Sequence, residues 1–173
     1  MQTARDGVGL YYVHVGHAPY RSILTAWCSL VLGVCSAYAV MSPWPLEELA
    51  KRADMVVLGT VIELKSAWDA KYTAIHTDVT LAVEHVLAGR REEEVVTLQV
   101  AGGSVRGIGM RTSHDATFQV GERVIVFLDR RAVPSTVVGM QQGKFAVTGN
   151  TVARADEAWD LQAFMEAVRA AAR

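Results

Sequence analysis

The side chains that could do chemistry in this chain are few and scattered. His76 and Asp78 are two residues apart in an alternating segment, so both belong to one face of a predicted strand. A tight metal site needs three or four converging donors, and this face supplies two. We therefore interpret the pair as part of a solvated strand face and predict no metal and no cofactor.

Two further patterns have the residue types of a functional site but not its spacing. Ser113-His114-Asp115 contains the groups of a hydrolase triad, yet a triad is assembled from separate elements and not from consecutive residues. Gly102–Gly107 has the spacing of a phosphate-binding loop, but Ile108 stands where the motif requires lysine. We interpret the first as a turn, find no nucleotide motif in the second, and name no catalytic residue.

Composition excludes one broad class of partner. The 173 residues carry a net charge of −1, so no basic footprint for nucleic acid is present. The hydrophobic content of 51% is enough for one core, and the length fits a single domain with accessory segments.

An uncharged apolar segment, Ser22–Met41, precedes the body of the chain and contains both cysteines. Ala37-Tyr38-Ala39 inside it is an A-x-A cleavage pattern. We predict that residues 1–39 are an N-terminal extension and signal peptide, and that 40–173 are one exported domain. The alternative is an uncleaved anchor, because about 20 apolar residues can span a bilayer. A membrane is a partner only in that case. Both alternatives predict a secreted, periplasmic or cell-envelope protein.

The rest of the chain has the periodicity of strands. Thr73–Leu87 alternates most strictly, and Met55–Leu58 is an unbroken apolar run that suits a strand buried on both faces. After Gly59 we expect Ile62 and Leu64 to share one face. Ala101–Gly109 is rich in glycine and predicts a wide turn or a bulged strand. The predicted strands are Met55–Leu64, Thr73–Leu87, Val95–Val100, Phe118–Val120 and Arg123–Leu128, with a final hairpin of Val137–Met140 and Lys144–Thr148.

Helices are predicted at the two ends of this β-rich region. Residues Ser42–Pro45 open a short helix, with Pro45 in its first helical position. A tail helix covers Asp156–Arg173, is capped by Asp156, and has an apolar stripe that includes Phe164. We expect this stripe to pack on Val124–Leu128, whose two faces are both apolar. The predicted fold is mainly β, a small OB-like β-barrel with a short N-terminal helix and a C-terminal helix.

Three segments carry a resemblance to a known family: Ala53–Val61, Thr77–Gly89 and Gly121–Phe127. Together they resemble the OB-type barrel of netrin-like and metalloproteinase-inhibitor-like modules, as found in uncharacterised exported bacterial proteins. The resemblance covers Glu47–Val147 and implies an extracellular barrel with a binding role. The inhibitors of that family bind protease zinc through an N-terminal cysteine. A chain that begins at Val40 has none, so that mechanism is not implied here.

These observations together predict a non-enzymatic exported module that binds a protein or cell-envelope partner. OB-type barrels bind on the outer face of strands 2 and 3 and on the neighbouring loop. The ligand-binding residues predicted on this basis are Trp68, Lys71 and Tyr72 in a loop Ser66–Tyr72, and His76 and Asp78 on the next strand. Two alternatives stay open: an exported hydrolase whose site is not visible in the sequence, and an OB-type nucleic-acid binder.

Overall fold

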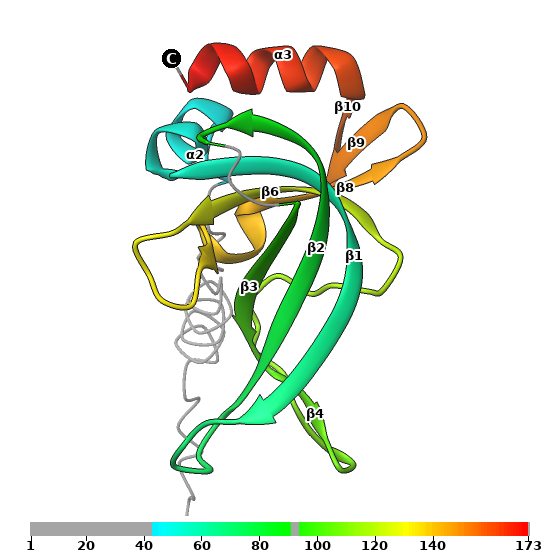
Figure 1. The fold of residues 1–173 in the computed structure, drawn as a ribbon. Coiled ribbons are helices and arrows are strands. Elements are labelled where there is room, and N and C mark those ends of the chain that lie inside the picture. Colours follow the sequence, from blue (N-terminus) through cyan, green and yellow to red (C-terminus); the bar gives the residue numbers. More distant parts are fainter. Residues whose placement is uncertain (1–42, 91–93, 173) are drawn as a thin grey trace, which may run out of the picture. The chain divides into compact units, whose positions relative to one another are not determined.

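The structure is a computed structural model that describes residues 43–90 and 94–172 (Figure 1). Ser42–Arg173 form one compact unit. The predicted signal peptide, its cleavage site and both cysteines lie outside the described residues. No helix in the described ranges combines the length and the apolar character needed to cross a membrane.

An antiparallel sheet dominates the fold, which confirms that the protein is mainly β. Its central strand, β1, spans Met55–Trp68 and pairs with β2 (Ile75–Ala88) on one side and β6 (Arg123–Asp129) on the other. The order of pairing is β10-β9-β8-β6-β1-β2-β3, and β7 pairs with β6. The remaining bounds are β3 Val95–Ala101, β7 Thr136–Val137, β8 Lys144–Thr148, β9 Thr151–Arg154 and β10 Glu157–Asp160. A separate hairpin contains β4 (Gly103–Val105) and β5 (Ile108–Met110).

Apolar clusters cover both faces of this sheet. Met55 and Val57 belong to what we call the inner cluster, which also takes residues from β2, β3 and β6. Val56 and Leu58 belong to the outer cluster, which lies under the helices. All four side chains are at most 1% exposed. The prediction of a strand buried on both faces at its start is therefore confirmed, because period-2 alternation sends successive side chains to opposite clusters.

The expected face of Ile62 is wrong, and a β-bulge is the reason. The register between β1 and β2 shifts between Val61 and Glu63, so Ile62 is an extra residue in the ladder. Val61 before the bulge and Leu64 after it both contact the inner cluster. Ile62 turns outward and is 48% exposed.

The two helices pack in the outer cluster. Helix α2 spans Leu46–Arg52 and buries Leu49 and Ala50, with Pro45 as its N-cap and not its first helical residue as predicted. Helix α3 spans Leu161–Ala171. Its buried residues Phe164, Met165 and Val168 share the outer cluster with Ile125 and Phe127 of β6. The expectation that the apolar stripe of the tail helix belongs to the core is thus confirmed. The helix reaches β6 through β8, since the Phe164 ring lies 4.8 Å from that of Phe145 and the Phe145 ring lies 5.7 Å from that of Phe127.

Two predicted elements are wrong: the start of the tail helix and the strand Phe118–Val120. The tail helix begins at Leu161 and not at Asp156, because Asp160 caps it by accepting a hydrogen bond from the Ala163 N–H (3.0 Å). Residues 157–160 instead form β10. Phe118–Val120 is not a strand, since the Glu122 N–H donates to the Gln119 carbonyl (3.0 Å) and closes a turn there.

The predicted final hairpin is also wrong. Val137 ends β7, which pairs with β6. Gly139 then adopts a left-handed conformation (φ 65°) and a 3-10 helix follows over Met140–Gly143. This segment redirects the chain, so β8 pairs with β6 and β9 and not with β7.

Candidate functional site

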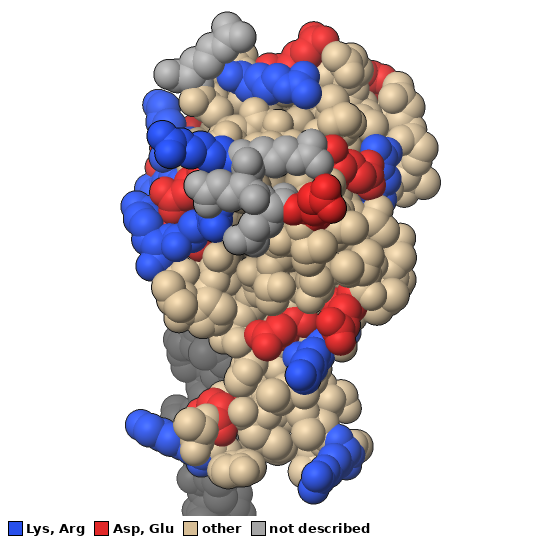
Figure 2. Space-filling model, in the orientation of Figure 1, with Lys and Arg blue, Asp and Glu red and all other residues tan. Residues whose placement is uncertain are grey.

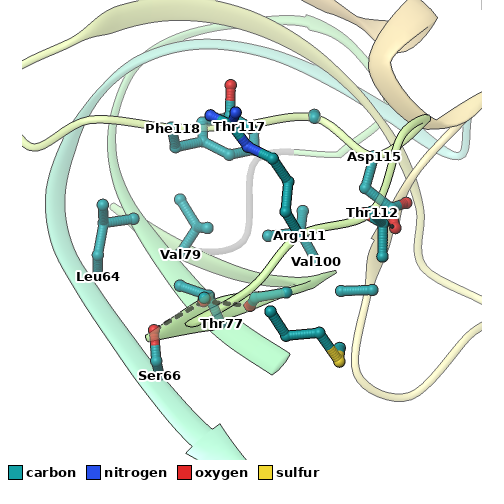
Figure 3. A pocket seen from close by; sticks show the side chains of 15 residues that line it. Leu64, Ser66, Thr77, Val79, Val100, Arg111, Thr112, Asp115, Thr117 and Phe118 are labelled. Carbon is teal, nitrogen blue, oxygen red and sulfur yellow. Dashed lines mark hydrogen bonds between the residues drawn. The ribbon is translucent and has the colours of Figure 1, made fainter. Parts of the chain in front are cut away.

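One end of the inner face opens into a cavity of about 260 Å³, which we call the end cavity (Figure 3). Its lining comes from β1, β2, β3, the β4–β5 hairpin and the loop that follows β5. Apolar side chains form most of its wall: Leu64, Val79, Val100, Met110, Ala116 and Phe118. An apolar hollow with a few convergent polar groups is the usual form of a binding site.

A chain of hydrogen bonds lies at one side of the end cavity. The Thr77 hydroxyl donates to the Gly102 carbonyl (2.7 Å), and the Ser66 and Thr77 hydroxyl oxygens are 2.8 Å apart (Figure 3). Since the single Thr77 proton goes to Gly102, Ser66 is the donor of the second bond. Thr77 is 8% exposed, so this arrangement satisfies a buried hydroxyl. Both hydroxyls are thus held by each other and by the backbone, and not by a basic side chain that could activate a nucleophile.

Glycine is required where β4 begins beside these hydroxyls. Gly103 has φ 137°, and a Cβ there would overlap the side-chain oxygens of Thr77 and Ser66. At Gly102 (φ 91°) a Cβ would approach the Met110 carbonyl oxygen to 2.8 Å. The pair therefore lets the β4–β5 hairpin cross close to β1 and β2. This close approach is the structural reason for glycine at these two positions of the segment Ala101–Gly109.

A loop held by Lys144 forms the opposite side of the cavity. The Lys144 ammonium donates to the Thr117 carbonyl, lies 2.6 Å from a Glu122 carboxylate oxygen and sits 4.7 Å from the centre of the Phe118 ring. These contacts fix Phe118 over the inner cluster. Arg111 extends across the cavity toward Thr117 and Phe118 (Figure 3).

The residues predicted from sequence to bind a ligand do not line the end cavity, and they fall into two groups. Trp68 is the last residue of β1, paired with Ile75 and half-buried, so the predicted loop begins later than Ser66. Lys71 and Tyr72 lie in the exposed turn between β1 and β2. The other group, His76 and Asp78, lies on the half-buried face of β2.

The second group is tied to its neighbour β3. The Gln99 side-chain amide donates to the Asp78 carboxylate (2.8 Å). His76 borders a shallow hollow of about 350 Å³ together with Gln99, Thr136 and Met140. Trp68 and His76 were both predicted to contact one ligand, but Trp68 pairs with Ile75 and His76 with Ala67. Their side chains therefore lie on opposite faces of the β1–β2 ladder.

The triad residue types at positions 113–115 do not form a relay. The Ser113 hydroxyl and His114 Nδ1 are 2.7 Å apart, but both residues are exposed. The Asp115 carboxylate accepts instead from the Thr112 hydroxyl (2.9 Å), and it therefore does not orient the imidazole. Within residues 43–90 and 94–172, no group of three or more His, Cys, Asp or Glu side chains converges on a possible metal position.

A larger hollow of about 430 Å³ lies between α3 and β8–β10. Its aromatic walls, Phe145 and Phe164, belong to the outer cluster. The Arg154 guanidinium lies 4.7 Å from the Phe145 ring and pairs with Glu157 at 2.9 Å. The charged groups Arg154 and Glu157 at this hollow are thus paired with each other.

Neither a scan against protein-family models nor a search of curated proteins finds a match to this chain.

The end cavity was missed by sequence reasoning because its walls come from distant segments. The signal that could have located it is the pair Gly102–Gly103, whose conformational freedom is needed only where two backbones or side chains approach closely.

Proposed function

We propose that this protein is an exported, non-enzymatic binding module that engages a protein or cell-envelope partner through the end cavity. Export rests on the uncharged segment Ser22–Met41 and its A-x-A pattern. In this proposal an apolar group of the partner enters the cavity.

We further propose that the curled sheet is an OB-like barrel. The inner cluster supports this, because one apolar face is shared by the adjacent strands β6, β1, β2 and β3. The gap between the ends of this run is narrow: the Gln99 N–H of β3 donates to the Ser135 carbonyl, one residue before β7 (2.8 Å), and β7 pairs with β6. Strands β1, β2, β3, β7 and β6 thus follow one another around the inner cluster.

The end cavity is the observation that carries the binding proposal. Its walls are mostly apolar, and the hydroxyls of Ser66, Thr77 and Thr112 are engaged in internal hydrogen bonds. Such a hollow stabilises an apolar guest by removing it from water, at roughly 25 cal/mol per Å² of apolar surface buried.

The test fills the cavity and asks whether a partner is lost. Ala116 is 4% exposed and lines both the end cavity and the hollow beside His76, so Ala116→Leu adds apolar volume to both. Met110 lines the end cavity but not that hollow. Ala132→Leu adds the same bulk in a loop that borders neither the end cavity nor the two other hollows, and it is the matched control. Both exported variants and the parent protein serve as bait for native envelope extract, with captured proteins quantified by mass spectrometry.

We expect one or more partners to be captured by the parent protein and by Ala132→Leu, and lost with Ala116→Leu. Thermal melts establish that each bait is folded. Overpacking can destabilise a protein by about 1–3 kcal/mol, so Met110→Phe at another wall is a second filling variant. Identical capture by all folded baits would exclude the end cavity as the binding site.

A further inference from the structure

Two hairpins extend beyond the rest of the sheet at its lower end in Figure 1. One is the β1–β2 hairpin, whose turn is residues 69–74. The other is the β4–β5 hairpin, whose turn is Arg106–Gly107. We call these two turns and their flanking residues the hairpin tips. They are separate from the residues that line the end cavity, so a role for the tips is independent of the function proposed for that cavity.

The first tip holds an aromatic side chain in solvent. The Asp69 carboxylate accepts from the Thr73 N–H (2.6 Å), the Thr73 hydroxyl (2.7 Å) and the Ala74 N–H (3.2 Å). These hydrogen bonds, those from Thr73 foremost, hold the pKa of Asp69 below its usual range. Tyr72 inside this turn has φ 56°, which non-glycine residues rarely adopt, and is 77% exposed. The turn is thus ordered by its own hydrogen bonds while it displays Tyr72.

The second tip repeats this arrangement with an aliphatic residue. Arg106 (φ 50°) and Gly107 (φ 82°) both have positive φ, as the central residues of a type I′ turn require. Ile108 follows directly and is 56% exposed. A two-residue turn of this type leaves little freedom in where Ile108 points, because its register with Val105 is fixed by pairing.

Each tip also carries a basic side chain next to its apolar one. Lys71 precedes Tyr72, and Arg106 stands two residues before Ile108. Neither charged group has an ion pair with another residue of the described ranges. Figure 2 shows Lys or Arg side chains at the lower end of the molecule, where the two hairpins project, and a smaller area of Asp or Glu beside those on the left.

We propose that the hairpin tips dock the protein onto an anionic membrane surface. Tyr72 and Ile108 enter the headgroup region, where amphipathic aromatic rings are favoured. Lys71 and Arg106 lie against lipid phosphates, which attract basic residues near the surface. Two narrow, separate tips suit a bilayer surface, because lipids rearrange around an inserted side chain and the protein needs no surface that is complementary in shape. A protein partner would instead favour one continuous packed patch.

The test measures binding to sedimentable vesicles of phosphatidylcholine alone and of phosphatidylcholine with phosphatidylglycerol. The exported protein is recovered without detergent, and its N-terminus is read by mass spectrometry so that all variants are compared in the same form. We expect binding to the anionic vesicles that weakens as salt is raised. Lys71→Gln and Arg106→Gln should each weaken it by about 5-fold, and by about 30-fold together.

Apolar insertion is tested separately from charge. Tyr72→Ser combined with Ile108→Ser should weaken binding to both vesicle types. Val133→Ser is the matched control, since Val133 is 95% exposed in a different loop, and it should bind as the parent protein does. All these positions are exposed, so melts should stay unchanged. The proposal is overturned if the parent protein does not bind anionic vesicles, or if the tip variants bind them as tightly as the parent does. It is also overturned if Val133→Ser loses as much binding as the tip variants do.

Discussion

Replacing Phe164 by alanine should lower the melting temperature by about 9–25 °C. Phe164 is 4% exposed, and its ring centre lies 4.8 Å from that of Phe145 and 5.4 Å from that of Trp159. These distances are typical of favourable aromatic pairs. The side chain therefore joins α3 to β8 and β10 at the centre of the outer cluster.

The magnitude follows from how such sites respond to truncation. Removing a buried phenylalanine side chain costs about 3–5 kcal/mol, which includes the cavity left behind. In a folded unit of this size, 1 kcal/mol shifts the melting temperature by about 3–5 °C. Differential scanning calorimetry or circular dichroism measures the shift directly, and denaturant unfolding gives the free energy independently.

Gln162→Ala is the control on the same helix. Gln162 is exposed and its side-chain amide donates to Glu166 (2.7 Å), so its removal should change stability by less than about 0.5 kcal/mol. Equal melts for Phe164→Ala and Gln162→Ala would refute the assignment of α3 to the core. The apolar stripe of the helix would then be available to a partner.

Three other predictions concern separate parts of the chain. Mass spectrometry of the exported protein should show a chain that starts at Val40; a full-length cytoplasmic product would contradict the signal peptide. Gly103→Ala should destabilise the fold more than Gly107→Ala, because both have positive φ but a Cβ meets neighbouring atoms only at Gly103; equal denaturant midpoints would argue against the close approach at β4. The hydrogen bond from Arg123 lowers the pKa of Glu84, so the stability from this group is present above its unfolded pKa and lost as pH falls through the folded value. Glu84→Gln should therefore be less stable at neutral pH and lose less stability between about pH 5 and pH 3; parallel pH profiles would contradict this.

Much of the sheet could be predicted because its strands have strong local patterns. Along β2, residues Ile75, Thr77, Val79, Leu81 and Val83 are buried and their neighbours are half-buried, as strict alternation predicts. The bulge at Ile62 could not be predicted in this way. Ile62 has the same β-propensity as its neighbours, and only the pairing with β2 decides which residue is left out of the ladder.

The predicted start of the tail helix at Asp156 was wrong for a different reason. Residues 157–160 contain Glu, Ala, Trp and Asp, which fit the first turn of a helix, and Asp156 could cap one. The observed β9–β10 hairpin places Trp159 opposite Val152 and lets its ring contact Phe145 at 5.8 Å. Tertiary packing thus overrode local propensity. The end cavity was out of reach for a related reason, since no single segment contributes its wall.

The position of α3 has a consequence for how the chain matures. Phe127 is translated well before Phe164, yet both belong to the outer cluster. At about 5–20 residues per second of synthesis, several seconds pass between the two. During that interval, the outer cluster lacks the side chains that α3 contributes. An export route that keeps the chain unfolded until it has crossed the membrane avoids this incomplete cluster, because strand and helix are then available together.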